Sequence, residues 1–488
     1  MVFSSSIFLF GFLPLLLICY AVAWRISLKL SNIVLLAFSL LFIFWGSGKD
    51  TLVLLSMIVI NYVAGLLLTL KTGSLLLPKN QKRTPYQRTV LVLTLVLSFG
   101  LLIYFKYAYF LADNASDLLA RIGINIPVPA FIKNILLPLG ISFYTFQALS
   151  YTLDVYFGNV KTTRSLMDFS LYVSFFPQLI AGPIVRYAHI YQQIGKRSIN
   201  LNGVYTGMLR FMMGFVKKVL LANTVAKAAD GVFGLASPEL TAGVAWVGII
   251  AYTLQIYLDF SAYSDMAIGL AKIFGFDLRE NFNLPYTSTS IQDFWRRWHI
   301  SLSSWFRDYL YIPLGGNRKG NVRTYLNLVI VFFICGLWHG AAWNFVLWGL
   351  WHGFFLVIER AFLENWLKKL PGFLRRVYMF VVVIVGWVLF RAESLTYALK
   401  YIKTLFTPQK FAGQLLRVPG EFLQNDVLIA FIVGIIASMG GMMWLKKEAD
   451  RKGGVLQNAF TALVFVLFLV AITSIYSGAY NPFIYFRF

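Results

Sequence analysis

Long hydrophobic runs separated by short polar segments occupy most of the chain. Runs of this kind lie at residues 6–24, 31–46, 51–70, 89–112, 134–157, 241–260, 325–358, 376–391, 427–445 and 458–476. Many approach the roughly 20 residues that an α-helix needs to cross about 30 Å of hydrocarbon. None alternates with the period of two that a membrane β-strand would show. The pattern therefore predicts an all-α fold, a polytopic bundle of transmembrane helices.

Two further segments carry hydrophobic residues but do not form full spans. Residues 169–183, FSLYVSFFPQLIAGP, are too short to cross and end in Gly-Pro. We predict a re-entrant segment there, since irregular backbone at membrane depth must be buried by protein or line a cavity. Residues 186–218 carry six spaced basic residues and predict amphipathic helices at the cytoplasmic interface.

The positions of Lys and Arg predict the orientation of the spans. Residues 71–88, 277–323 and 360–376 are rich in basic residues, which places them in the cytoplasm, and residues 113–130 then fall outside. The run at 325–358 must therefore enter the membrane and return as a hairpin. His339 lies at the turn of this hairpin, at the end of an arm that reaches on the order of 22 Å into the membrane.

The composition is also that of a membrane protein, and it indicates which partners the chain binds. Hydrophobic residues make up 59% of the 488 and charged residues 13%, against about 25% charged in soluble domains. We read residues 1–488 as a single integral membrane domain. The net charge of +23 is spread over the loops, which suits contact with membrane lipids and not with nucleic acid. Cys19 and Cys335 are too few and too separate for a metal cluster, so we expect no metal.

Two histidines are the strongest candidates for chemistry. His299 and His339 are two of only four histidines and lie in hydrophobic, tryptophan-rich surroundings. An ionisable residue at membrane depth is costly, and burial keeps an imidazole neutral and able to accept a proton. The alternative is that each is a core histidine that donates to a carbonyl. His352, in a second Trp-His-Gly, is thirteen residues and about 220° of helix away from His339, so it is not an obvious partner.

Other polar residues near the histidines have more than one reading. Arg296 and Arg297 are placed to orient a substrate or stabilise an oxyanion. Asp265, with Asp259, either contacts substrate or pairs with arginines of residues 279–323. Cys335 suits a small buried filler better than a nucleophile, because burial in hydrophobic surroundings keeps a thiol protonated.

Five ordered blocks of sequence resemble a known family. They are LPLGISFYTFQALSYTLDVY at 137–156, SFFPQLIAGPIVRY at 174–187, LQIYLDFSAYSDMAIGL at 254–270, the block at 280–320 that contains FWRRWHISLSSWFRDYLYIPLGG, and GLWHGAAWNFVLWGLWHG at 336–353. These blocks resemble the membrane-bound O-acyltransferases, and within them the bacterial branch that O-acetylates polysaccharides such as alginate. The resemblance covers most of residues 130–360, which we take as the family core.

The resemblance implies a helical fold with re-entrant and interfacial helices around a funnel in the bacterial cytoplasmic membrane. It implies His339 as the essential histidine and His299 as the second, and we expect Trp338, Arg296, Arg297 and Asp265 to bind substrate. Acetyl-CoA is then the cytoplasmic donor, with no permanently bound cofactor. An extracytoplasmic SGNH-type acetyltransferase or similar partner and an exported polysaccharide would receive the acetyl group.

Two alternatives remain at this stage. The first is transfer of D-alanine or another acyl group to a cell-envelope polymer, as in a more distant relation of the same superfamily. The second, from another class, is a polysaccharide or lipid flippase or channel subunit. A transporter would be expected to show internal repeats with paired broken helices, and the sequence has no such symmetry.

Overall fold

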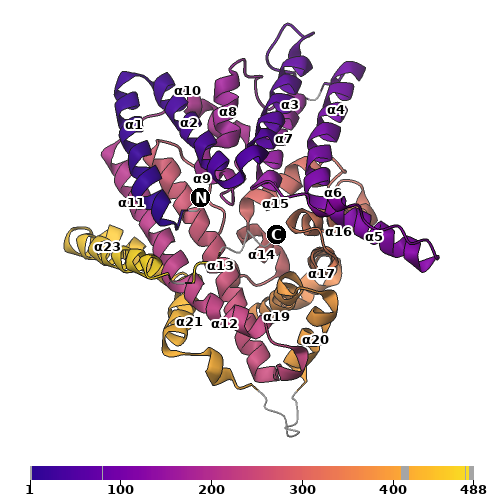
Figure 1. Ribbon diagram of the computed structural model, residues 1–488, viewed down its shortest axis with the longest axis vertical. Helices are drawn as coiled ribbons and strands as arrows, with labels where there is room; N and C mark the ends of the chain where they lie inside the picture. The colour runs from indigo at the N-terminus through magenta and orange to yellow at the C-terminus, as the bar shows by residue number, and fades with distance from the viewer. Residues whose placement is uncertain (1–2, 80, 408–416, 479, 483–488) are drawn as a thin grey trace. The chain divides into compact units, whose positions relative to one another are not determined.

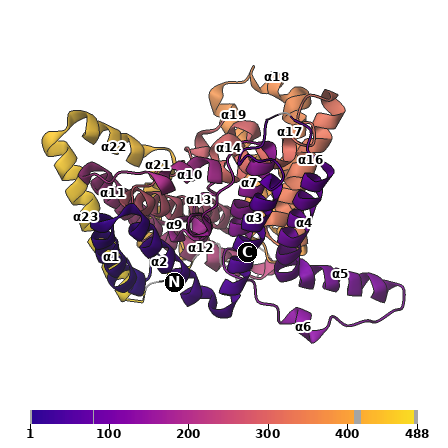
Figure 2. The same ribbon diagram turned by 90° about the horizontal axis from the view of Figure 1, so that it is seen from above.

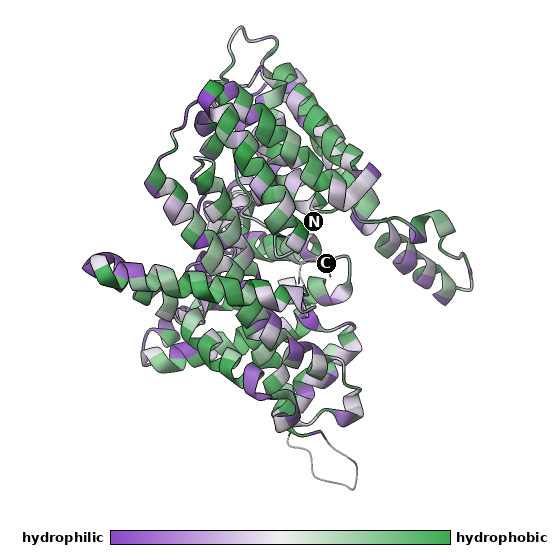
Figure 3. Ribbon diagram, turned by 60° about the vertical axis from the view of Figure 1, so that its left-hand side comes forward, coloured by the Kyte–Doolittle hydropathy of each residue, from purple (hydrophilic) through white to green (hydrophobic). Residues whose placement is uncertain are grey.

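The computed structural model describes residues 3–79, 81–407, 417–478 and 480–482, and these form helices joined by turns (Figure 1). No β-strand occurs among them, which confirms the all-α prediction. Within these residues eight helices are long and hydrophobic enough to cross a membrane, and a bent pair makes a possible ninth. Figure 3 shows hydrophobic residues along the outer faces of the long helices. The chain is a multi-pass membrane protein.

The chain divides into two compact units. The first comprises Met1–Gly207 and Leu270–Arg279. Its main helices are α1 (Leu13–Ile26), α2 (Leu28–Ser47), α3 (Thr51–Thr69), α4 (Pro85–Leu102), α5 (Ala108–Arg121), α7 (Ile141–Phe157), α8 (Leu166–Ser174), α9 (Phe176–Leu179) and α10 (Tyr187–Gly195). Helix α7 packs against α3 and α4, and its residues from Ile141 to Val155 are all buried. It is the central helix of this unit.

Two predictions in the first unit can be compared with the structure. The run at 134–157 is helical only from Ile141, because Pro138 and the left-handed Gly140 precede the helix, so its predicted start was wrong. The predicted re-entrant segment consists of two short helices, α8 and α9, that are interrupted at Phe175. Residues 171–185 are buried, as a re-entrant segment requires.

The second unit comprises Met208–Gly269 and Glu280–Phe488. It contains the end of α11 (Leu201–Val216), the π-helix η4 (Lys217–Ala222), α12 (Asn223–Phe233), most of α13 (Ala242–Ile273), α14 (Ile291–Arg297), α15 (Ile300–Phe306), α16 (Gly320–His339), α17 (Trp343–Ile358), η8 (Glu359–Leu363), α19 (Gly372–Arg391), α20 (Leu395–Phe406), α21 (Asn425–Ser438), α22 (Gly441–Lys452) and α23 (Gly454–Tyr476). The predicted run at 427–445 is not one helix, because α21 and α22 meet at 62°. Gly440, at a φ of +98°, makes this break possible.

The predicted hairpin at 325–358 is present as α16 and α17, which lie side by side with α14 and α19 around them (Figure 2). Two glycines allow the two arms to touch. A Cβ on Gly349 would lie 2.2 Å from the carbonyl oxygen of Phe332, and one on Gly336 would lie 2.3 Å from that of Phe345. The close approach of the two backbones fixes the turn that follows His339.

Candidate active site

His339 is the last residue of α16, at the turn of the hairpin where the sequence predicted it. Its side chain is 6% exposed. Three aromatic rings pack edge-on against the imidazole, with centroid distances of 4.9 Å to Trp338, 4.9 Å to Trp348 and 5.2 Å to Phe390. These rings come from α16, α17 and α19, so the helix packing orients His339.

His299 lies between α14 and α15, as the N-cap residue of α15, and is fully buried. Its φ of +43° is unusual for a residue other than glycine. Asn281 fixes the ring: its side-chain oxygen lies 3.2 Å from Nδ1 of His299 and accepts from the backbone N–H of Ser301 at 3.1 Å. The backbone carbonyl of Asn281 also accepts from Ile300 N at 2.9 Å.

The contacts of Asn281 determine the tautomer of His299. The atom that accepts from the Ser301 backbone N–H must be the amide oxygen, so Nδ1 of His299 donates to it and Nε2 carries the lone pair. Burial lowers the pKa of His299 to about 3, because the interior disfavours the imidazolium. His299 is therefore neutral at physiological pH, with Nε2 as the basic nitrogen.

Trp338 joins the two histidines. Its ring centroid lies 5.9 Å from that of His299 and 4.9 Å from that of His339. The structure thus brings together three of the predicted residues, which belong to segments forty residues apart in the sequence. Each imidazole therefore packs on the same indole ring.

His352 lies closer to this group than its sequence position suggested. On the hairpin its ring is 5.2 Å from Trp348, which in turn packs on His339 at 4.9 Å. His352 is fully buried, and within the described chain neither of its ring nitrogens has a hydrogen-bond partner. It is separated from His339 by one indole ring and does not contact it.

The predicted charged residues are placed differently from the histidines. Arg296 is exposed on α14, and Arg297 pairs with Asp293 of the same helix at 2.9 Å. Neither guanidinium contacts either histidine among the described residues. Asp265 pairs with Arg210 at 2.9 Å and with Lys217 at 2.5 Å. It is held in an ion-pair network.

The ion partners of the aspartates come from another segment than residues 279–323, the one that the pairing alternative named. Asp265 pairs with Arg210 and Lys217, and Asp259 pairs with Lys218 at 2.9 Å. The reason is that α11 and η4 run beside α13, which puts the basic residues of one helix opposite the acids of the other.

Two positioning residues were not recognised from the sequence. Asn281 is one, and Glu359 is the other. The carboxylate of Glu359 accepts from the backbone N–H groups of Ile291 and Gln292 at 2.6 and 3.0 Å and thus caps α14, the helix that leads to His299. Glu359 could have been noticed because it is an acidic residue directly after a hydrophobic run. Asn281 could not, because a single Asn between charged and aromatic residues is an ordinary feature of a sequence.

The chain is similar to proteins of one known family over most of its length. The family model for MBOAT, the membrane-bound O-acyltransferase family, matches residues 40–400, a wider span than the quoted motifs. A probable alginate O-acetylase AlgI of Azotobacter vinelandii is 39% identical over the full length of both chains. Its counterpart in Pseudomonas aeruginosa is 44% identical over 83% of this chain and 75% of that protein. A peptidoglycan O-acetyltransferase of Helicobacter pylori is 35% identical over 83% and 79%.

These matches decide between the classes left open by the sequence. The family model covers well over half of the chain, including both histidine blocks, and the relatives are named as an O-acetylase and an O-acetyltransferase and not as transporters. The multi-pass architecture agrees with a protein of the bacterial cytoplasmic membrane. The chain belongs to the membrane-bound O-acyltransferase family and is an O-acyltransferase.

Proposed function

We propose that this enzyme takes an acetyl group from acetyl-CoA on the cytoplasmic side and passes it across the membrane for O-acetylation of an exported, alginate-like polysaccharide. The observation that carries the proposal is the group His299, Trp338 and His339, in which two buried imidazoles flank one indole. The similarity to alginate O-acetylases supports acetyl as the acyl group and alginate as the model acceptor.

The chemistry assigned to this group is a single acyl transfer. A hydroxyl oxygen bonds to the thioester carbonyl carbon, and the C–S bond breaks. The hydroxyl proton passes to the imidazole of His339, which acts as general base, and then to the leaving thiolate, so that the products are an acetate ester and a free thiol. Nε2 of His299, whose orientation is fixed by Asn281, accepts a hydrogen bond from the reacting groups.

The charged residues are given separate roles. Arg296, exposed at the end of α14, is the residue we assign to the anionic phosphates of the donor. Arg297 and Asp265 are already held in ion pairs, and we assign them to fixing α14 and α13. The attacking hydroxyl belongs to the extracytoplasmic acceptor, an SGNH-type acetyltransferase or similar partner protein, so the acetyl group leaves the enzyme as the ester formed in this one transfer.

The test is the substitution His339→Ala in the full chain, expressed with its partner and acceptor. We expect acetylation of the exported polymer to fall by at least about a hundredfold, as for loss of a general base. His299→Ala should also impair transfer strongly. His189→Ala, on α10 of the first unit, is the matched control and should retain acetylation. Wild-type acetylation by a well-expressed His339→Ala protein with unchanged thermal melting would contradict the proposal.

Peptidoglycan is a second candidate acceptor, because the Helicobacter pylori relative is named for that activity. The two acceptors separate by a direct measurement. Base-labile acetyl esters would be counted in purified exopolysaccharide and in purified peptidoglycan from cells with and without the His339→Ala substitution. Loss of acetyl only from peptidoglycan would replace the polysaccharide as the acceptor and leave the assigned chemistry unchanged.

A further inference from the structure

The chain continues beyond α23 as a short segment, Tyr480–Pro482, that binds to the second unit. The hydroxyl of Tyr480 donates to a carboxylate oxygen of Asp230 at 2.5 Å. The amide of Asn223 donates to the side-chain oxygen of Asn481 at 3.0 Å. The ammonium of Lys218 donates to the backbone carbonyl of Pro482. Three consecutive residues are thus each held by a polar side chain of η4 or α12.

The helix before this segment, α23, makes its own contacts with the second unit. Phe460 and Val464 pack with Leu209 and Ala449, and the ring of Phe468 packs on that of Phe215 with centroids 5.0 Å apart. These contacts and the buried Ala471 lie at least nine residues before Tyr480. The three polar contacts belong to the segment itself, and we refer to Tyr480–Pro482 as the C-terminal latch.

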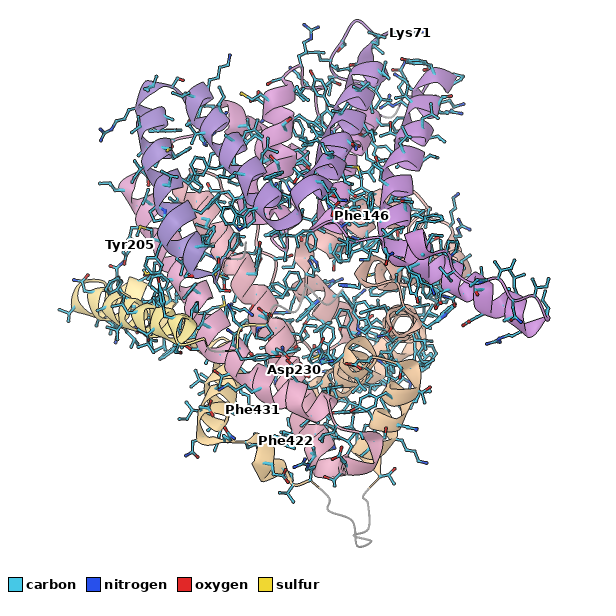
Figure 4. The ribbon with its side chains drawn as sticks, viewed as in Figure 1. Lys71, Phe146, Tyr205, Asp230, Phe422 and Phe431 are labelled. Atoms are coloured by element: carbon cyan, nitrogen blue, oxygen red, sulfur yellow. The ribbon has the colours of Figure 1, made fainter. Side chains whose placement is uncertain are left out.

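The first anchor, Asp230, has a second partner near His339. Its other carboxylate oxygen accepts from Arg391 at 2.6 Å, and both side chains are largely buried. Arg391 directly follows Phe390, whose ring packs on the imidazole of His339 at 5.2 Å. Figure 4 labels Asp230 on α12. One carboxylate thus connects the latch with the helix end that orients His339.

The anchor at the other end of the latch, Lys218, has a second partner near His299. It pairs with Asp259 at 2.9 Å, and the two side chains are 3% and 1% exposed. Asp259 directly precedes Phe260, whose ring packs on His299 with a centroid distance of 4.7 Å. Each end of the latch therefore binds one member of an ion pair, Asp230 with Arg391 at one end and Lys218 with Asp259 at the other.

The physical reason for coupling is the low dielectric around these ion pairs. A buried charge that loses one of its hydrogen-bond partners is destabilised, and the remaining partners shift to compensate. Loss of the Tyr480 contact would remove one hydrogen-bond donor from Asp230 beside Arg391, and loss of the Pro482 contact would remove one acceptor from Lys218 beside Asp259. Either change displaces a residue adjacent to a ring that packs on a histidine.

We propose that the C-terminal latch is a positioning element of the active site, acting through Asp230 on His339 and through Lys218 on His299. This inference rests on the proposed function, because the histidines must be the reacting groups for their position to affect transfer. The latch is expected to affect the rate of acyl transfer and not the binding of the donor, since its contacts lie one residue beyond the rings that surround the imidazoles.

The test compares Tyr480→Phe with Tyr397→Phe. Both substitutions remove one hydroxyl, but the hydroxyl of Tyr397 donates to the backbone carbonyl of Leu235 and has no contact with the latch. Each variant is made in the full chain and reconstituted with partner and acceptor. Three quantities are measured: acetyl transfer as a function of acetyl-CoA concentration, thermal melting in detergent, and the rate at which carboxypeptidase removes C-terminal residues.

For Tyr480→Phe we expect about a tenfold lower kcat with an unchanged KM for acetyl-CoA and unchanged melting, together with faster removal of C-terminal residues. Tyr397→Phe should match the wild type in kcat, KM and digestion. Asp230→Ala should lower kcat at least as much, and combining it with Tyr480→Phe should add little, because Asp230→Ala already removes the acceptor of the Tyr480 hydroxyl.

Three results would contradict the proposal that the latch positions the histidines. The first is faster digestion of Tyr480→Phe with wild-type transfer, and the second is unchanged digestion, which would mean that the hydroxyl does not hold the segment. The third is a fall in melting temperature that fully parallels the loss of transfer. His339→Ala is measured in parallel. Full acetyl transfer by His339→Ala would refute the proposed function. If His339→Ala loses transfer but Tyr480→Phe transfers acetyl like the wild type, only the proposal for the latch is refuted.

Discussion

The two histidines of the candidate site are held in different ways. His299 is fixed by hydrogen bonds: Nδ1 donates to Asn281, and its backbone adopts a left-handed conformation at the start of α15. His339 is fixed by ring packing at the end of α16, and its position depends on the hairpin formed with α17. One site depends on a polar network and the other on the close contact of two helices.

The two kinds of contact determine different properties, the tautomer of one imidazole and the position of the other. A hydrogen-bonded imidazole has a defined tautomer, so the network around His299 decides which nitrogen is basic. A ring-packed imidazole has a defined position, so the hairpin decides where the imidazole of His339 lies. Substitutions around His299 should therefore lower the rate of acetyl transfer in a folded protein, whereas substitutions in the hairpin should lower the stability of the fold.

The largest effect is expected at the hairpin, from Gly349→Val. The Cβ would meet the Phe332 carbonyl oxygen at 2.2 Å and Gly336 Cα at 3.0 Å, so the helices must separate. We expect a loss of stability at or above the usual 1–3 kcal/mol of overpacking and no measurable transfer. The measurement is thermal melting in detergent alongside polymer acetylation.

Gly100→Ala is the matched control for the hairpin, because no atom lies within 4 Å of its Cβ position on α4. It should keep both melting and acetylation, with a small gain from the better helix propensity of Ala. If Gly349→Val melted like the wild type and transferred acetyl, the hairpin contact would not be what positions His339.

A smaller effect, mainly on activity, is expected from Asn281→Ala. It leaves the backbone N–H of Ser301 and Nδ1 of His299 without their acceptor, at a cost of about 1–3 kcal/mol. We expect transfer to fall by about 10- to 100-fold, since the tautomer and orientation of His299 are no longer fixed. The protein should remain folded, in contrast with Gly349→Val.

Asn281→Asp tests the polar network around His299 through the pH dependence of acetyl transfer. In the wild type the pKa of His299 is about 3, so this residue stays neutral and causes no loss of activity between pH 5 and 8. A carboxylate at position 281 favours the imidazolium and raises that pKa, so the variant should lose transfer as the pH falls through the raised value. A pH–rate profile parallel to that of the wild type would exclude a role for neutral His299.

The smallest effect is expected from His352→Phe. The ring stays in contact with Trp348, and within the described residues no hydrogen bond is lost, so transfer should change by less than about threefold. Acetyl transfer in reconstituted membranes is the measurement. A loss as large as that of His299→Ala would make the second Trp-His-Gly part of the reacting group.

Much of the architecture could be predicted from the sequence because it depends on local pattern. Hydrophobic run length predicted the spans, and the basic residues flanking 325–358 predicted a hairpin with His339 at its turn, which the structure contains as α16 and α17. The start of α7 and the break between α21 and α22 were missed, since a Pro or Gly within a hydrophobic run changes its composition little.

The contents of the site were only partly predictable. His299 and His339 stood out because an imidazole is unusual in hydrophobic surroundings, whatever the fold. Their connection through Trp338, the hydrogen bond of Asn281 and the cap supplied by Glu359 join residues that are far apart in sequence or of ordinary type. No periodicity or spacing identifies such partners.

The sequence by itself determined the class of the protein, a helical membrane enzyme, and it singled out two histidines as candidates, because hydropathy, charge and residue type are properties of the chain alone. The tertiary structure decided how those residues are used. It paired Asp259 and Asp265 with basic residues of η4 and α11 and brought Tyr480 to Asp230. Contacts of this kind depend on which helices pack together, and that is fixed only when the whole bundle excludes water and each buried charge must find a partner.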